Sequence, residues 1–130
     1  MASIRRETLI AVPPEAAWDA IRDVGALHRR LVPGFVTETR LEPGARLVTF
    51  ASGRVLREVI VACDDAARRL VWSVRDPWFE HHNASLVVEP AAGGARVTWT
   101  ADLLPDREAA LVAGLMEGGL AGMKATLEAA

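Results

Sequence analysis

Six consecutive segments between residues 35 and 103 alternate apolar and polar side chains, which is the pattern of half-buried β-strands. They cover residues 35–41, 46–50, 54–63, 70–75, 81–89 and 96–103. The breaks between them are short and rich in turn-forming residues, such as Glu42-Pro43-Gly44 and Ser52-Gly53. Strands joined by such short turns pair as antiparallel neighbours. The sequence therefore predicts an antiparallel meander through the middle of the chain.

The segments on either side of this meander complete the expected fold. Residues 3–12 form a β-branched, alternating segment that Pro13-Pro14 ends. A short helix is expected from Pro14 to the residue before Gly25, a second helical turn over residues 26–31, and a long helix from Pro105 to the C-terminus. We expect an α+β fold, in which a curved seven-stranded antiparallel sheet wraps around the long C-terminal helix.

A chain of 130 residues corresponds to a single domain, which we place at residues 1–130. One long helix covers only part of the apolar face of seven strands, so the sheet must curl around it. A curled sheet that grips a helix leaves a hollow at one end, and such hollows are common ligand sites. We therefore look for function between the sheet and the C-terminal helix.

Charge and apolar patterning exclude several kinds of partner. The chain has 15 basic and 17 acidic residues, with no basic run longer than a pair, so we expect no nucleic acid and no stable membrane association. No stretch approaches the length of a membrane span. Cys63 is the only cysteine, and no signal-peptide pattern follows Met1. We expect a cytoplasmic protein, either a monomer or a homodimer, with a small apolar molecule as its partner.

Metal and cofactor sites find little support in the sequence. His81 and His82 are neighbours on a strand and point to opposite faces, while His28 is distant in the chain, so we expect no metal site. The negative charges of Asp64-Asp65 would raise the pKa of the adjacent Cys63, which argues against a nucleophile. No glycine-rich phosphate loop joins a strand to a helix, and we expect no cofactor.

The C-terminal helix carries an apolar arc and an unusual number of glycines. The arc comprises Leu111, Val112, Leu115, Met116, Leu120, Met123 and Leu127. Gly114, Gly118, Gly119 and Gly122 each cost about 1 kcal/mol relative to alanine inside a helix. Two explanations remain open: close packing of the helix on a strand or a kink in the helix, or room kept for a ligand beside Gly119.

Strand alternation indicates which side chains face the helix. Trp72, His82 and Trp99 have the inward parity of their strands, and the two tryptophans serve either as core or as a ligand platform. In residues 54–63 both parities carry one charge, so the pattern alone does not decide between Glu58 and Arg57. A buried Glu58 would have a raised pKa unless a cation or donor, for instance His82, lay near it.

Several short motifs in a fixed order resemble one known superfamily. They are Val12-Pro13-Pro14-Glu15-Ala16-Ala17-Trp18, Ile21-Arg22-Asp23-Val24, Gly53 with Glu58 five residues on, Asp64, Leu70-Val71-Trp72, Val97-Thr98-Trp99 and Pro105. Nearly the whole chain resembles the START-like, or SRPBCC, superfamily of helix-grip proteins, in particular its bacterial polyketide cyclase/dehydrase and lipid-transport branch.

The resemblance implies a cavity between the long helix and the sheet. The ligand-binding residues it implies are Val48, Phe50, Glu58, Trp72, His82, Trp99, Val112, Met116, Gly119 and Leu120. It also favours Glu58 over Arg57 as the inward charge, and it implies a lid at Ser52-Gly53. The family often has a tyrosine at the position of His82, and this chain contains no tyrosine.

Two functions of different classes follow. The first is the binding, without catalysis, of a small hydrophobic molecule of the lipid, isoprenoid or aromatic polyketide type, with Glu58 and His82 orienting it. The alternative is a polyketide aromatase/cyclase in which Glu58 and His82 transfer protons. A packed structural or partner-binding module is a third possibility. The open end would carry Trp78 and Phe79 as an apolar rim, unless these two pack on the short helices or form a dimer contact.

Overall fold

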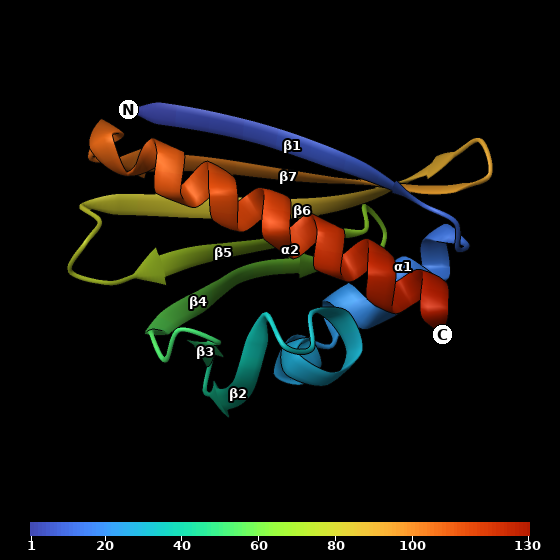
Figure 1. The fold of residues 1–130 in the computed structure, drawn as a ribbon, viewed down its shortest axis with the longest axis horizontal. Helices are drawn as coiled ribbons and strands as arrows, with labels where there is room; N and C mark the ends of the chain where they lie inside the picture. The colour runs from blue at the N-terminus through green and yellow to red at the C-terminus, as the bar shows by residue number, and fades with distance from the viewer.

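The computed structural model describes residues 1–130, and its elements follow the predicted order (Figure 1). The strands are β1 (Ala2–Ile10), β2 (Val36–Glu42), β3 (Ala45–Phe50), β4 (Val55–Asp64), β5 (Arg69–Arg75), β6 (His81–Ala91) and β7 (Gly94–Leu104). The helices are α1 (Pro14–Arg22) and α2 (Ala109–Ala129), the latter preceded by a 3-10 turn at Asp106–Glu108. The expected second short helix is a 3-10 turn, Val24–Ala26, followed by a π-helical turn, Leu27–Leu31.

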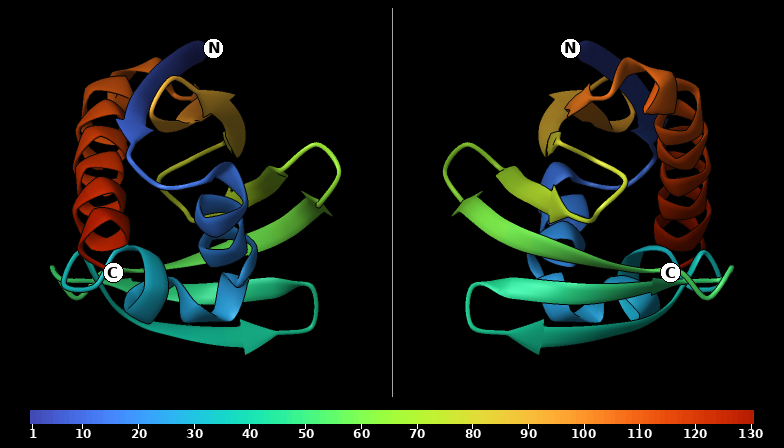
Figure 2. Two further views of the ribbon diagram at one scale, coloured as in Figure 1. Left: turned by 90° about the vertical axis from the view of Figure 1, so that its right-hand side faces the viewer. Right: turned by 90° about the vertical axis from the view of Figure 1, so that its left-hand side faces the viewer.

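All seven strands form one antiparallel sheet in the order β1-β7-β6-β5-β4-β3-β2. The predicted meander runs from β2 to β7, and β1 closes the far edge by pairing with β7. The sheet bends strongly, and α2 runs along its concave side (Figures 1 and 2). This is the helix-grip arrangement that the resemblance implies, with the strands within about two residues of their predicted bounds.

The helix α1 fills one end of the space between the sheet and α2. Pro14 occupies its first turn and Glu15 lies near its positive end, which suits the start of a helix. Its buried side chains include Trp18 and Ile21, and it packs against β6 and β7. The Trp18 indole Nε1 donates a hydrogen bond to Asp65 Oδ1 at 2.9 Å, which ties α1 to the turn after β4.

The buried face of α2 is narrower than the sequence predicts. Val112, Met116, Gly119, Leu120 and Met123 are its buried residues. The predicted burial of two further leucines is wrong, since Leu111 is 44% exposed and Leu115 is 36% exposed. Both lie at the edge of the apolar arc, where the curved sheet no longer covers the helix. No helix in the structure has the length and apolarity needed to cross a membrane.

Close packing explains two of the four glycines in α2. A Cβ on Gly119 would lie 2.7 Å from Trp99 Cζ3, and a Cβ on Gly118 would lie 2.9 Å from Phe35 Cε1. A Cβ on Gly114 would meet nothing within 4 Å. The space beside Gly119 is therefore taken by the indole of Trp99, which favours the packing explanation over room kept for a ligand.

Candidate functional site

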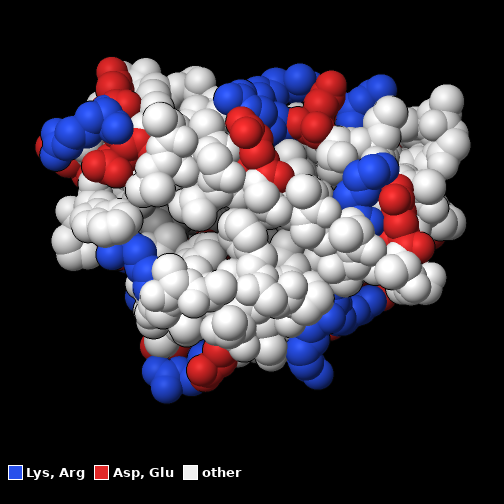
Figure 3. Space-filling model, in the orientation of Figure 1, with Lys and Arg blue, Asp and Glu red and all other residues white.

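A cavity lies between α2 and the concave face of the sheet. About 70 Å³ inside it is open to the centre of a water molecule, well above the roughly 10–15 Å³ that one water requires. Fifteen of the nineteen lining residues are hydrophobic. Figure 3 shows a hollow below the N-terminal half of α2, in a face with most of its charged side chains at the margins. The half-exposed Leu115 lines the cavity and marks the transition from its interior to solvent.

The structure brings nearly all of the predicted site residues to this cavity. Those that line it are Val48, Phe50, Glu58, Trp72, His82, Trp99, Val112, Met116 and Gly119. Leu120 does not: it is 4% exposed and belongs to the packed core. It follows Gly119 by one residue, about 100° around the helix, and so faces a filled region of the core.

Sequence reasoning missed further lining residues, of which Arg46 has the most chemical importance. Other missed residues are Leu27, Val32, Phe35, Val36, Leu56, Val74, Leu86, Leu115 and Met123. Arg46 has the same strand parity as Val48 and Phe50, both of which were expected to face inward. The strand parity of Arg46 therefore indicated an inward side chain. It was overlooked because arginine side chains are usually exposed.

Arg46 and Glu58 form a buried ion pair in the cavity wall. The guanidinium Nε donates to Glu58 Oε1 at 2.9 Å, and the two side chains are 4% and 8% exposed. Nη1 of Arg46 donates to the carbonyl oxygen of Val24 at 3.2 Å. The guanidinium carbon also lies 5.8 Å from the ring centroid of Trp72, within the range of a cation–π contact. Arg57, the alternative inward charge, is exposed and pairs with Glu42 at 3.2 Å.

The partner of Glu58 is therefore Arg46, and the suggestion that His82 fills this role is wrong. In the sheet register, Glu58 pairs with Val74 of β5, and His82 belongs to β6 on the other side of that strand. Two strand spacings set a separation of at least about 10 Å between the backbones of Glu58 and His82, and the β5–β6 pairing ends before Val74 and His82. The side chain of Val74, which also lines the cavity, stands between them.

His82 is a buried, neutral imidazole. Its residue is 8% exposed, and its Nδ1 is buried without a hydrogen-bond partner. Burial, and secondly the nearby His81, lower the pKa of His82 from 6.5 to about 4. The ring packs edge to face on Phe79, with centroids 4.6 Å apart. At neutral pH this imidazole forms hydrogen bonds without charge, and it is a weak base for proton transfer.

Two tryptophans form part of the cavity wall, and Trp72 lies next to the guanidinium of Arg46. Trp72 and Trp99 meet edge to face with centroids 5.7 Å apart, and both line the cavity. The indole Nε1 of Trp99 is buried without a hydrogen-bond partner. An unpaired indole donor and an unpaired imidazole nitrogen thus both belong to residues that line an otherwise apolar cavity.

Trp78 and Phe79, which were expected to form an apolar rim together, have different environments in the structure. Trp78 is 47% exposed, and its ring lies under the guanidinium of Arg54, 3.1 Å from the ring centroid. Arg54 Nη2 also pairs with Asp76 Oδ1 at 2.5 Å, which ties the turn before β4 to the loop after β5. Phe79 turns inward onto His82 and packs against the core. Trp78 therefore packs on Arg54, and the expected alternative of packing on the short helices is wrong for it.

The single cysteine and the potential metal-binding side chains form no candidate site. Cys63 is exposed, and the pKa of its thiol is raised by partial burial and then by the charge of Asp65, which leaves it a poor nucleophile. No three histidine, cysteine, aspartate or glutamate side chains come together in a way that would hold a metal ion.

Comparison with known proteins places this geometry in a family. Residues 1–128 match the model of a family described as polyketide cyclase / dehydrase and lipid transport. No curated protein matches the sequence.

Solved structures with the same fold cover almost the whole chain. An uncharacterised protein from Bacillus thuringiensis is 18% identical with a TM-score of 0.87, over 97% of this chain and 98% of that one. A Thermobifida fusca protein solved by NMR is 32% identical with a TM-score of 0.75, over 99% and 93% of the two chains. The di-domain ARO/CYC protein BexL, from the BE-7585A biosynthetic pathway, is 17% identical with a TM-score of 0.81, and the match covers 98% of this chain and 47% of BexL.

Proposed function

The chain belongs to the polyketide cyclase/dehydrase and lipid transport family, and from this premise we propose that it binds a small hydrophobic molecule in the cavity between the sheet and α2. The observation that carries the proposal is the cavity itself, which is mostly apolar and opens to solvent beside Leu115. An apolar molecule gains free energy when such a wall removes its surface from water.

The size of the cavity supports a compact ligand. About 70 Å³ is open to the centre of a water molecule, and the indoles of Trp72 and Trp99 supply flat walls. This shape favours a small ring system over a long acyl chain. Aromatic rings pack well against indoles in edge-to-face or offset arrangements.

The polar groups in the wall support an orienting role. Nε and Nη1 of Arg46 are engaged by protein acceptors, and no protein acceptor meets Nη2. A ligand oxygen near Nη2 would receive a charge-assisted hydrogen bond. His82 offers a second, uncharged hydrogen-bonding position across Val74.

The same geometry supports binding more than proton transfer by Glu58 and His82. Arg46 holds the Glu58 carboxylate, and the lowered pKa of His82 makes its imidazole a weak base at neutral pH. A substrate would also need to reach both residues across at least about 10 Å of sheet. We therefore place the aromatase/cyclase alternative second.

Native mass spectrometry of the protein purified from its own source tests the proposal. The expected result is a retained apolar molecule of small mass that organic solvent extracts. A protein that carries nothing, and that also fails to take up an apolar probe such as naphthalene, contradicts the proposal.

A further inference from the structure

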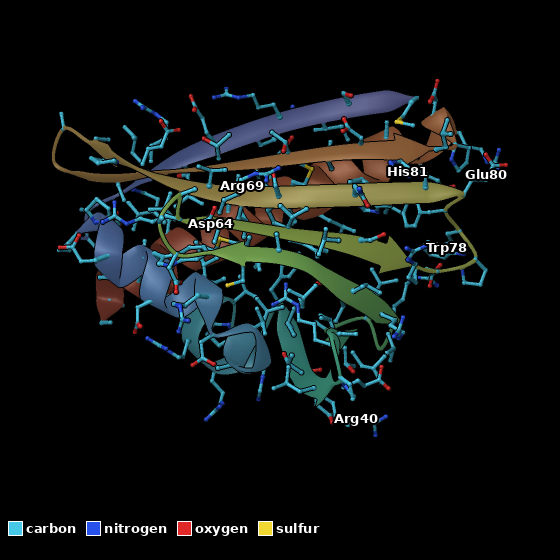
Figure 4. All side chains as sticks on the ribbon, turned by 180° about the vertical axis from the view of Figure 1, so that it is seen from behind. Arg40, Asp64, Arg69, Trp78, Glu80 and His81 are labelled. Carbon is cyan, nitrogen blue, oxygen red and sulfur yellow. The ribbon has the colours of Figure 1, made fainter.

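Strands β5 and β6 separate at one end and leave a notch between them. The last paired residues of this ladder are Ser73 and Asn83, although β5 continues to Arg75 and β6 begins at His81. Figure 4 shows Trp78 and Glu80 in the loop that joins the two diverging strands, and His81 where β6 begins. The notch between the strands has about 380 Å³ open to the centre of a water molecule.

Residues from both faces of the sheet line this notch. Ser73, Arg75 and Asn83 belong to the parity that faces outward, whereas Val74 and His82 face inward and also line the main cavity. The notch and the main cavity share two lining residues, Val74 and His82. The notch therefore adjoins the apolar cavity at Val74 and His82.

The boundary between the two spaces holds an unsatisfied polar atom. Nδ1 of His82 is buried and has no hydrogen-bond partner, although the residue is more than nine-tenths buried. Buried polar groups are rarely left unpaired, because the loss of their water contacts is costly. A ligand atom at this boundary would satisfy the imidazole.

The chemistry of the notch indicates the kind of group it accepts. Ser73 and Asn83 contribute a hydroxyl and an amide, which both donate and accept hydrogen bonds. Arg75 and Glu80 contribute opposite charges, and the charge of Asp76 is already engaged by Arg54. The notch thus has hydrogen-bonding capacity and no excess of either charge.

We propose that this notch is a binding site for an uncharged polar group, such as a hydroxyl or carbonyl, of a ligand whose apolar body occupies the main cavity. The ligand is then a small amphiphile that His82 contacts at the junction of its apolar and polar parts. This inference rests on the proposed function, because it assigns the polar end of the molecule that the cavity binds.

Three probes of one ring system test the assignment: naphthalene, 2-naphthol and 2-naphthoate. Calorimetry or quenching of tryptophan fluorescence gives the dissociation constant of each for the full chain. We expect 2-naphthol to bind about tenfold more tightly than naphthalene, and 2-naphthoate to bind more weakly than 2-naphthol.

Variants of His82 test whether the preference for 2-naphthol over naphthalene arises at the notch. In His82→Leu, the preference for 2-naphthol over naphthalene, measured as the ratio of their dissociation constants, should disappear. His82→Gln keeps an uncharged hydrogen-bonding group and should retain part of the preference. Should His82→Leu fail to fold, His82→Gln takes its place, and an unchanged preference in that variant overturns the notch assignment.

The outcomes separate this inference from the proposed function. Equal binding of naphthalene and 2-naphthol by the wild type, or an unchanged preference in His82→Leu, overturns the notch assignment and leaves cavity binding intact. If 2-naphthoate binds most tightly of the three probes, the assignment of the notch to an uncharged polar group is wrong. Binding of none of the probes contradicts the proposed function itself.

Discussion

Arg46 Nε donates a hydrogen bond to Glu58 Oε1 across 2.9 Å, inside a cavity wall that is otherwise mostly apolar. The two residues are direct cross-strand partners on β3 and β4, so the register of the sheet places the charges opposite each other. Val24, in the 3-10 turn, accepts a further hydrogen bond from the same guanidinium. The pair therefore joins the two strands to the short helical segments that border the cavity.

Breaking this pair should destabilise the fold more than replacing it. Arg46→Met leaves the Glu58 carboxylate buried without a cation, and we expect a loss of about 3–5 kcal/mol in the free energy of unfolding. The double variant Arg46→Met/Glu58→Met removes both charges and should recover most of this loss. Urea unfolding of Arg46→Met, Glu58→Met and the double variant measures the free energy of interaction between the two side chains. If the losses of stability in the two single variants add up to the loss in the double variant, the ion pair makes no net contribution to stability.

Two glycines of α2 should respond oppositely to alanine. Gly119→Ala places a Cβ 2.7 Å from the Trp99 ring, which also packs edge to face on Trp72, and we expect a loss of about 1–3 kcal/mol in the free energy of unfolding. Gly114→Ala meets nothing within 4 Å and should gain about 0.5–1 kcal/mol from helix propensity. Thermal unfolding of the two variants provides the comparison. A gain of stability in both would mean that Trp99 does not limit the approach of α2 to the sheet.

The pH dependence of stability should report the burial of His82. The pKa of His82 is about 4 in the folded protein and 6.5 without burial, so the unfolded chain binds the proton more readily between these values. Stability is therefore complete above pH 6.5 and falls as the pH drops towards 4, by about 2 kcal/mol between pH 7 and pH 5. Denaturant unfolding across this range measures the slope.

His82→Leu is the matched variant for this measurement, because it keeps His28 and His81 and removes only the buried imidazole. Its stability should change little between pH 7 and pH 5. A slope equal to that of the wild type would assign the pH dependence to another group and would contradict a neutral, buried His82.

The sequence predicts the fold well because alternation, turns and the terminal helix all act locally. The same alternation placed Trp72, His82 and Trp99 inward, and each lines the cavity. It could not decide between Glu58 and Arg57, since either parity carries one charge. The deciding partner, Arg46, lies on a neighbouring strand, so its effect depends on the register between strands.

Two other features of the site depend on where neighbouring elements stop packing against each other: the notch between β5 and β6, and the exposure of Leu115 on α2. The alternating patterns of β5 and β6 continue past Ser73 and Asn83, yet the pairing between the strands stops there. Leu115 matches the apolar arc of α2 but lies beyond the cover of the curved sheet. Neither the splay of two strands nor the curvature of a sheet is encoded in a local pattern, and the notch was therefore not predicted.

Neighbouring positions on α2 give the most direct test of cavity binding. Val112 is buried and lines the cavity, whereas Leu111 is exposed and does not. The measurement is the dissociation constant of naphthalene for the wild type, Val112→Phe and Leu111→Phe, with thermal unfolding as a check on folding. We predict that Val112→Phe fills part of the cavity and weakens binding about tenfold or more, while Leu111→Phe stays within about twofold of the wild type. Equal binding by all three folded proteins would contradict the account, because the ligand would then lie outside the cavity between the sheet and α2.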